Sequence, residues 1–515
     1  VQTCALPIYP SEKNYLVSQQ ITLLSGTLVN LSTSSITQLT DQTPIFNIVN
    51  KSGITIINGV FNGKAESTYV NSSSSNAVAI SAAGASNVIV ENNSFNGFYY
   101  SPLKCLSGGV NIRFNNNNVV GIPLVLAADP NRRNTTGVTI IGTNTQIKGN
   151  SITGTASGII VGEGSVNVIV SENIIYSMVN EHGIYADTGI RRLAITNNII
   201  FGTGTFGNGI KVQFYDSFGV QPSSTNISDN VIFNTGTDGI LVNNTTAGTP
   251  TIRLVGLVIS DNVIVDSGSN GLNVRFTEDA TINGNTVINC YSAGVQYGAS
   301  QRIKLHDNKV RGAGTSGIRD VVSASDFVSV KDNEVYNVAT RNLVGDEFGI
   351  LQALNSTNVE IEGNRVSDQN SNMQYGIFLQ PATNANVKLS GNRATGATDT
   401  GLRTIATDAF AEYGNNDFSG SIGAAVASSA AKSVASASTI TLPQRCEVVS
   451  ITGTTNIDNI TAVGRTNARV TLVFSAALTV NVAGNIKLNG GAFAARGDTR
   501  PEGQHRYRRH GQQNR

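Results

Sequence analysis

His182 lies in the stretch NEHGIYAD, Asn180–Asp187, with an acid on either side, and histidine occurs only four times in 515 residues. A histidine among carboxylates can act as a general acid or base, or can bind and orient a substrate. It can equally be a polar residue that a repeating strand carries without any chemistry. The elements that hold His182 therefore have to be established first.

Internal repetition is the strongest structural signal in this chain. An asparagine recurs after an apolar-x-x step and before x-Val, x-Ile or x-Phe, at intervals of 23 to 32 residues from Asn93 onward. These asparagines are Asn58, Asn93, Asn118, Asn150, Asn173, Asn198, Asn230, Asn262, Asn285, Asn308, Asn333, Asn364, Asn392 and Asn416. A glycine followed by Ile, Leu or Val keeps step with them, at Gly158, Gly183, Gly209, Gly239, Gly271, Gly294, Gly317, Gly349, Gly376 and Gly401.

The two markers predict an all-β solenoid, a parallel β-helix in which each coil stacks about 4.8 Å above the last. Asparagines at equivalent turns are expected to stack into a ladder of side-chain amides along one edge. A leucine-rich repeat is excluded, because it requires leucine at fixed positions and a shorter period.

The glycine marker also assigns side chains to faces. Residues one position after each glycine are all apolar and are expected to point inward, so those two and four positions after it point outward. The outward polar residues of the coils from Asp187 onward are Tyr185, Lys211, Gln213, Asn243, Asn273 and Arg275. A flat face of this kind suits a polysaccharide, possibly an acidic one, although an ordinary solvated sheet surface has the same composition.

Over about Phe46–Ser419 the repeat resembles right-handed, single-stranded parallel β-helix proteins of the pectate-lyase-like superfamily. This scaffold carries lyases, hydrolases, isomerases and binding proteins, so the resemblance implies the fold more firmly than an activity. Its polygalacturonase branch has an Asp-Asp pair, then His-Gly, then Arg-x-Lys in successive coils.

His182-Gly183 matches the His-Gly step of that branch, whereas Lys211 and Gln213 replace its Arg and Lys. Ala156 and Ser157 stand where the two aspartates belong, so hydrolysis by that constellation lacks its acid and its base. His182 is therefore kept as a substrate-binding candidate.

Another pair of acids is a candidate for catalysis. Glu163 lies five positions after one marker glycine and Asp187 four positions after the next, so their backbones are expected about 6 Å apart. Carboxyl groups at such a separation suit a retaining mechanism. No coil supplies the converging carboxylates of a calcium site, so neither a metal nor a cofactor is expected.

Both ends of the chain differ from the rest. Residues 1–8, VQTCALPI, read like a translated sequencing adapter, and residues 500–515 read like a frameshifted tail, with a basic nucleic-acid arm as the alternative. Without the five Arg and one Glu of that tail the formal charge falls from +1 to −3, so nucleic acid is not expected as a partner. No apolar run is long enough to span a membrane. Of the four cysteines, Cys4 lies in the adapter stretch, and the other three, Cys105, Cys290 and Cys446, are too far apart in sequence to predict a disulfide framework.

The remaining chain divides into a lead-in or cap (9–45), the β-helix (46–420), an Ala/Ser-rich linker (421–438) and a small β module (439–499). The module contains the β-rich stretches STITLP (438–443), VVSITGTTNIDNIT (448–461), GRTNARVTLVFSAALTV (464–480) and GNIKLNGGAF (484–493). With these stretches it resembles a short all-β module at the end of phage tail and tailspike-like proteins, which implies a homotrimer. Two hypotheses follow: a virion tail protein that binds a surface polysaccharide, with or without degrading it, or a secreted polysaccharide lyase or glycoside hydrolase. The sequence leaves open which glycan is bound and whether it is cleaved.

Overall fold

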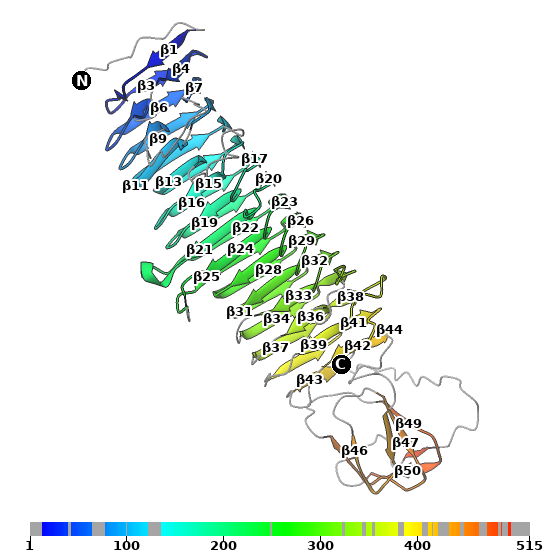
Figure 1. Ribbon diagram of the computed structural model, residues 1–515. Coiled ribbons are helices and arrows are strands. Elements are labelled where there is room, and N and C mark those ends of the chain that lie inside the picture. Colours follow the sequence, from blue (N-terminus) through cyan, green and yellow to red (C-terminus); the bar gives the residue numbers. More distant parts are fainter. Residues whose placement is uncertain are drawn as a thin grey trace, which may run out of the picture.

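The computed structural model describes residues 13–39, 43–63, 78–98, 100–121, 135–247, 250–321, 325–341, 347–352, 356–379, 386–403, 410–414, 416–420, 432–442, 448–462, 471–482, 486 and 493–495. The predicted adapter (1–8) and tail (500–515) lie outside these ranges. Within them the only helical element is a short 3-10 turn, η3 (Asp216–Phe218). The chain winds into one elongated solenoid whose strands stack in sequence order from β1 to β44 (Figure 1).

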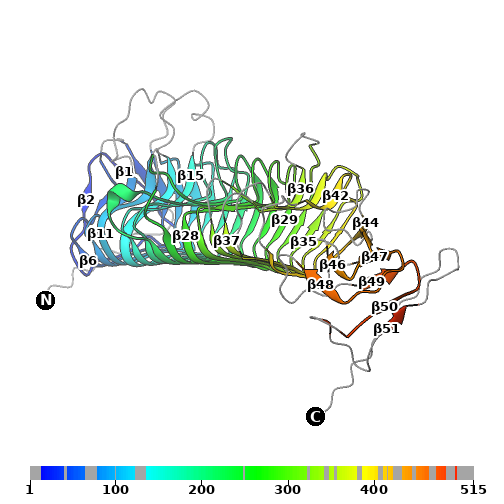
Figure 2. The same ribbon diagram turned by 90° about the horizontal axis from the view of Figure 1, so that it is seen from below.

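Each complete coil contributes to three parallel sheets, seen along their length in Figure 2. Sheet 1 contains the strands that carry the marker glycines' neighbours: β2 (Ile21–Thr22), β5 (Phe46–Asn47), β8 (Val78–Ser81), the first parts of β11 (Ser101–Asn115) and β13 (Thr136–Lys148), β15 (Ser157–Val161), β18 (Ile184–Ala186), β21 (Ile210–Phe214), β24 (Ile240–Asn244), β27 (Leu272–Arg275), β30 (Val295–Gly298), β33 (Ile318–Asp320), β36 (Phe348–Gln352), β39 (Tyr375–Leu379) and β42 (Thr400–Arg403).

Sheet 2 precedes the asparagine turn in each coil. It contains β3 (Leu28–Asn30), β6 (Ser52–Ile57), β9 (Ser86–Glu91), the second parts of β11 and β13, β16 (Val166–Ser171), β19 (Arg191–Thr196), β22 (Ser223–Ser228), β25 (Leu254–Ser260), β28 (Thr277–Asn283), β31 (Gln301–His306), β34 (Asp326–Lys331), β37 (Thr357–Glu362), β40 (Val387–Ser390) and β43 (Phe410–Gly414).

Sheet 3 follows the asparagine turn and has 16 strands. They are β1 (Asn14–Val17), β4 (Ser35–Gln38), β7 (Val60–Asn62), β10 (Ser94–Asn96), β12 (Asn118–Val120), β14 (Ser151–Thr153), β17 (Ile174–Tyr176), β20 (Ile199–Phe201), β23 (Val231–Thr235), β26 (Val263–Ser267), β29 (Thr286–Ile288), β32 (Lys309–Arg311), β35 (Glu334–Tyr336), β38 (Arg365–Ser367), β41 (Arg393–Thr395) and β44 (Asp417–Gly420). The predicted lead-in thus already contributes strands to all three sheets, from β1 onward.

The inward positions predicted from the glycine marker are confirmed. The residues after the marker glycines, from Ile159 to Leu402, are at most 1% exposed and belong to one continuous core. The glycines themselves are required by the close stacking of the coils. A Cβ on Gly183 would lie 2.7 Å from the Gly209 carbonyl oxygen of the next coil and 2.5 Å from the Ile200 side chain.

The asparagine ladder is the second recurring feature of the core. The Asn173 backbone N–H donates to Asn198 Oδ1 at 3.1 Å, and Asn173 Nδ2 donates to the same oxygen at 2.9 Å. Asn173 Nδ2 also donates to the Ile147 carbonyl in the preceding coil at 3.0 Å. Since the pattern repeats up to Asn416 and the amides are almost fully buried, each asparagine bridges its neighbouring coils.

Twelve of the fourteen predicted ladder asparagines are confirmed, and the assignments of Asn58 and Asn118 are wrong by one residue. Asn58 occupies the left-handed position before the ladder (φ 58°), and Gly59 donates its N–H to Asn93 Oδ1. Asn118 is an exposed residue of β12, whereas Asn117 is 2% exposed and joins the ladder. Because residues 115–118 are four consecutive asparagines, the sequence allows either Asn117 or Asn118 to occupy the ladder position. Burial of Val119, two positions after Asn117, selects Asn117.

A separate small core lies in the C-terminal β module. Its strands are β45 (Lys432–Ala435), β46 (Thr439–Leu442), β47 (Val448–Thr452), β48 (Asn459–Ala462), β49 (Thr471–Phe474), β50 (Leu478–Val480) and β51 (Phe493–Ala495). Most pair in parallel, and β50 pairs with β51 antiparallel. Residues 421–431 of the predicted linker lie outside the described residues, and β45 falls within its remainder.

The ladder correction gives a matched pair of substitutions. Asn117→Ala should lower the free energy of unfolding by about 3 kcal/mol, because it leaves the buried Asn93 N–H without its acceptor and removes the Asn117 Nδ2 bond to the Val90 carbonyl. Asn118→Ala, one residue away on the exposed side, should change it by less than about 0.5 kcal/mol. Denaturant unfolding of both variants measures the difference, and equal losses would contradict the assignment of Asn117 to the ladder.

Candidate functional site

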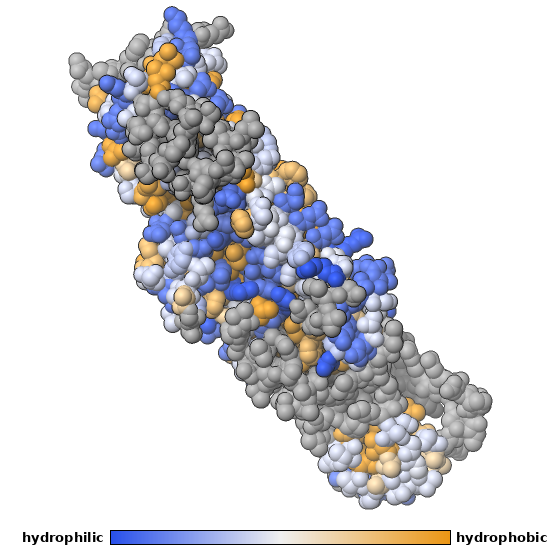
Figure 3. All heavy atoms as spheres, in the orientation of Figure 1, coloured by the Kyte–Doolittle hydropathy of each residue, from blue (hydrophilic) through white to orange (hydrophobic). Residues whose placement is uncertain are grey.

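A row of side chains runs along the outer face of sheet 1 in the predicted order. The strand register places the residues two positions after each glycine level with one another: Ile160, Tyr185, Lys211, Leu241, Asn273, Gln296, Arg319, Leu351, Phe378 and Arg403. In the second row Gln213 lies level with Asn243, and Arg275 lies level with Gly298. The space-filling view shows hydrophilic residues gathered over the middle coils (Figure 3).

These outward side chains are more covered than a plain sheet surface. Gln213 and Asn273 are each 7% exposed and Gln296 is 2% exposed, whereas Tyr185, Lys211 and Arg275 are half-buried. The buried amide side chains hold their neighbours in place. The half-buried residues Tyr185, Lys211 and Arg275 keep part of their surface accessible to a ligand. Asn243 is also half-buried, and its Oδ1 has no hydrogen-bond partner among the described residues.

Tyr185 and Lys211 form the centre of the first cluster. The Lys211 ammonium lies 5.3 Å from the centre of the Tyr185 ring, a cation–π contact between adjacent coils. Burial lowers the pKa of Lys211, and the carboxylates of Glu181 and Asp187 oppose that shift. Burial and the Asp187 carboxylate raise the pKa of Tyr185, so its phenol stays protonated and is held by Asp187 and Gln213.

His182 is placed by a hydrogen bond that its sequence context does not reveal. Its Nδ1 accepts the Asn208 backbone N–H at 3.0 Å, and its ring lies 5.5 Å from that of Tyr185. Burial, reinforced by Lys211, lowers the pKa of His182 to about 3, so the ring is neutral at ordinary pH. An Nδ1 that accepts a hydrogen bond leaves any ring proton on Nε2.

The bond made by His182 belongs to a second side-chain ladder, at the position just before each marker glycine. Asn208 Oδ1 accepts the Asp238 N–H, Asp238 Oδ1 accepts the Asn270 N–H, and Asn270 Oδ1 accepts the Ala293 N–H. His182 occupies the first place in this series. Its position is thus explained by coil stacking, without any role in chemistry.

A second cluster begins at Asp238, which sequence reasoning missed. Asp238 Oδ2 accepts from Asn273 Nδ2 at 3.0 Å, and Asn273 Oδ1 accepts from Gln296 and from Arg275. Gln296 Oε1 in turn accepts two N–H groups of Arg319, at 2.9 and 2.7 Å. The network fixes two guanidinium groups, Arg275 and Arg319, along the row.

The predicted catalytic pair lies at corresponding turns of adjacent coils. Glu163 is exposed in the turn after β15, and Asp187 is half-buried in the turn after β18, where it accepts the Thr188 N–H. The pairing of Val161 with Ala186 places Glu163 level with Thr188, one residue beyond Asp187. Glu181, which is not among the predicted site residues, precedes Tyr185 in the same coil and accepts a hydrogen bond from the Ser157 hydroxyl.

The coil before His182 has no carboxylate at the two positions where the polygalacturonase pattern has aspartates. Ala156 and Ser157 are both fully buried. No group of three or more His, Cys, Asp or Glu side chains in the described ranges could hold a metal ion. No helix in the part of the chain that the structure describes is long and apolar enough to cross a membrane.

The pKa of His182 predicts a pH dependence of stability. Because the folded chain holds this pKa at about 3 against 6.5 for an ordinary histidine, the unfolded state binds more protons between these values. Stabilisation by the neutral ring is therefore complete above pH 6.5 and is lost as the pH falls toward 3. His182→Asn keeps an acceptor for the Asn208 N–H and removes the titration.

Denaturant unfolding above and below pH 6.5 should therefore show a steeper loss of stability on acidification for the parent than for His182→Asn. His306→Asn is the comparison: burial lowers the pKa of His306 too, but this histidine is only half-buried and bonds the Ser329 hydroxyl. Identical pH profiles for the parent and His182→Asn would show that His182 is not held neutral.

Comparison with known proteins supports the fold. Residues 216–420, from just before β22 through β44, match a family model described as a right handed beta helix region. Sequence and structure agree: the fold is a right-handed parallel β-helix. No curated protein matches the chain.

Three solved structures illustrate the similarity. The pre-mature gene product 12 of bacteriophage phi29 gives a TM-score of 0.50 at 14% identity, over 92% of this chain and 69% of that one. A tailspike protein mutant of E. coli bacteriophage HK620 gives 0.48 at 12% identity, over 80% and 70%. The catalytic unit of a GH87 α-1,3-glucanase from Streptomyces thermodiastaticus gives 0.45 at 12%, over 75% of this chain and 64% of the unit's length. At these identities the likeness shows the fold alone.

Proposed function

We propose that this chain is the β-helical shaft of a phage tail or tailspike-like protein that binds a surface polysaccharide along the outer face of sheet 1. One observation carries the proposal: coils β18 to β33 hold an aromatic ring, amides and cations in one level row, fixed by their own hydrogen bonds. Ring faces and preorganised polar groups are what a hydroxyl-rich polymer requires. Because the row follows the solenoid axis, it fits an extended chain.

The charges of the row favour an acidic sugar. Lys211, Arg275 and Arg319 alternate with amides along the axis, and Asp238, the carboxylate of the second cluster, is 6% exposed beneath them. A carboxylate-bearing polymer could therefore contact cations without facing Asp238. The tail assignment is supported by the resemblance of the C-terminal module to tail proteins.

A secreted lyase or glycoside hydrolase is the second candidate, and the acids around Tyr185 favour it. If the polymer is cleaved, we propose Glu163 and Asp187 as the catalytic carboxylates, with Lys211 and Arg275 holding the acidic sugar. Glu163→Gln and Asp187→Asn should then each lower the rate by about 10² or more. His182→Ala should have little effect on the rate, since its Nδ1 is used by the backbone.

The measurement is release of reducing ends or of unsaturated sugar from a panel of acidic bacterial polysaccharides. Glu181→Gln is the matched comparison, because Glu181 also faces Lys211. If Glu181→Gln and Asp187→Asn lose activity while Glu163→Gln stays active, the second catalytic carboxylate is Glu181 and not Glu163. If the parent binds a polymer without cutting it, the binding function stands and the enzyme candidate is rejected.

We further propose a homotrimer, packed through sheet 3. Two level rows of outward apolar side chains follow the axis there: Ile174, Ile199, Val231 and Val263, and beside them Tyr176, Phe201, Phe233, Val265 and Ile288. Ile199 is 44% and Phe201 51% exposed. A second copy in the same orientation presents an equally long, straight apolar face. A closed three-fold arrangement would cover this face on every copy.

Light scattering should therefore give three chains per particle for the parent and one for the double variant Ile199→Glu, Phe201→Glu. The matched control is Lys309→Glu, Arg311→Glu on β32, which also faces outward from sheet 3 but lies beyond the apolar rows. A monomeric parent at micromolar concentration counts against the trimer. Dissociation of the control to the same extent would place the contact elsewhere on sheet 3.

A further inference from the structure

A groove of about 750 Å³ lies on the outer face of sheet 2, away from the row on sheet 1. Its floor is formed by β28, β31, β34, β37 and β40, which are consecutive in the sheet. Two level rows line it: Asp279, Arg302, Phe327, Asn358 and Asn386, and next to them Thr281, Lys304, Ser329, Glu360 and Lys388. Five coils make the groove about 19 Å long.

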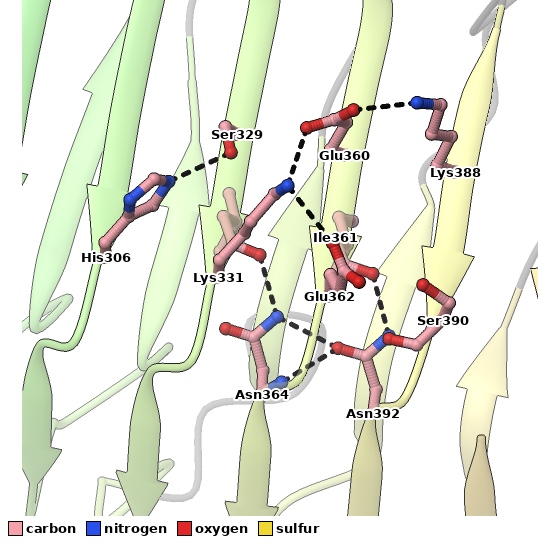
Figure 4. A network of polar contacts seen from close by, with 11 residues as sticks. His306, Ser329, Lys331, Glu360, Ile361, Glu362, Asn364, Lys388, Ser390 and Asn392 are labelled. Atoms are coloured by element: carbon pink, nitrogen blue, oxygen red, sulfur yellow. Dashed lines mark hydrogen bonds and ion pairs between the residues drawn. The ribbon is translucent and has the colours of Figure 1, made fainter. Parts of the chain in front are cut away.

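Charged side chains on the floor are held in place by one another. Figure 4 shows Ser329, Glu360 and Lys388 rising from neighbouring strands, with Glu360 bonded to both Lys331 and Lys388. Arg302 pairs with Glu278 and Asp279 at one end of the groove. Lys304 has no ion pair within the described residues, and it stands between these two groups in the row.

Phe327 departs from the pattern of its own column. The level position near the start of the sheet 2 strands has a left-handed backbone, and most coils place Asn, Asp, Gly or Ser there: Gly53, Asn87, Asn111, Asn144, Asn167, Ser224, Gly256, Asp279, Asn358 and Asn386. Arg192 and Arg302 are also exceptions, but each donates a hydrogen bond to the side chain at the same position in the preceding coil. Phe327 adopts φ 54° in the same position, and its side chain is 54% exposed.

Phe327 lowers the stability of the fold in two ways, through backbone strain and through the exposure of its ring. A bulky residue with left-handed backbone is strained by about 1–2 kcal/mol, and phenylalanine cannot offset this with a local hydrogen bond as asparagine can. Its ring gains little burial in return, since more than half of it faces solvent. Phe327 therefore lies at a backbone position that disfavours it, in the middle of a groove, with no gain in packing. Such a conflict indicates a functional use of the ring.

We propose that the sheet 2 groove is a second saccharide-binding site, which takes an acidic oligosaccharide segment with one sugar ring stacked on Phe327. Among the lining residues Arg302 and Lys388 are held in ion pairs, whereas Lys304 has no ion pair within the described residues and is the cation available to a ligand carboxylate. Asn358, Asn386, Ser329 and Thr281 supply hydrogen-bonding groups for hydroxyls along both rows. The site is on a different sheet from the row at Tyr185 and does not depend on the function proposed for that row.

An extended peptide fits the groove less well. Each floor strand from β31 to β37 already pairs with a strand on both sides, so its backbone offers no free edge for β-strand addition. Recognition must then come from side chains alone, and these are hydroxyls, amides, charges and one flat ring.

Phe327→Asn separates binding from stability in one substitution. Asparagine suits the left-handed backbone and occupies the same column in the next coil, so this variant should melt at a higher temperature than the parent. It should also lose about tenfold or more in affinity for the acidic oligosaccharide. A merely structural phenylalanine would give a lower melting temperature or unchanged binding, and either result overturns the proposal.

The absence of tryptophan from the chain gives a direct reporter. Phe327→Trp keeps an aromatic ring in the groove and makes it the only tryptophan, so a bound sugar should change its emission. Tyr336→Trp is the control, because Tyr336 lies on β35 of the same coil but on sheet 3. The probes are fragments of polygalacturonate, alginate and hyaluronate, with dextran fragments as the neutral comparison.

The Phe327→Trp signal should titrate with at least one acidic probe, weaken as salt is added and be reduced by Lys304→Gln. The Tyr336→Trp signal should stay constant. Lys211→Gln combined with Phe327→Trp should leave the titration unchanged, which separates this site from the row on sheet 1. No response to any acidic probe, or an equal response to dextran, overturns the proposal.

Discussion

Each coil rises by one strand spacing, about 4.8 Å, above the coil before it. This fixed rise is the constraint on which the rest of the structure depends. A buried polar group at one height must find its partner about 4.8 Å above or below it, and asparagine satisfies this with both ends of one amide. Its backbone and side-chain N–H groups donate to the next oxygen of the series, as at Asn230 and Asn262. The chain can therefore vary the length of its other turns by several residues per coil while the ladder keeps every strand in register.

Much of this architecture could be predicted from the sequence, because the constraint repeats. The inward residues after the glycines and the outward row from Tyr185 to Arg319 follow from a two-residue period and a recurring marker. The prediction went wrong by one residue at Asn118, where neighbouring asparagines offer two registers and only tertiary burial selects one. It went wrong by one residue at Asn58 as well, because a glycine, Gly59, occupies the ladder position there.

The environment of each functional side chain was less predictable. The bond from the Asn208 backbone to His182 and the network beginning at Asp238 join residues of different coils 23 to 35 positions apart, and turns of unequal length hide such columns in the sequence. Phe327 could have been found by aligning the residues before the asparagine turns, since Asp326-Phe327-Val328 is level with Thr357-Asn358-Val359. Its significance needs the left-handed backbone, which the sequence alone does not display.

The two side-chain ladders point in opposite directions along the solenoid. In the asparagine ladder the backbone N–H of one coil donates toward the C-terminal end, as from Asn198 to Asn230. In the ladder that starts at His182 it donates toward the N-terminal end, as from Asn208 to His182 and from Asn270 to Asp238. Over the coils from His182 to Ala293 their dipoles therefore oppose each other, and parallel strands add little of their own. Unlike the peptide dipoles of an α-helix, which add up, the two ladders of this stretch build no opposite charges at its two ends. A charged polymer lying along these coils meets no gradient from the two ladders, so the positions of individual charged side chains decide where it binds.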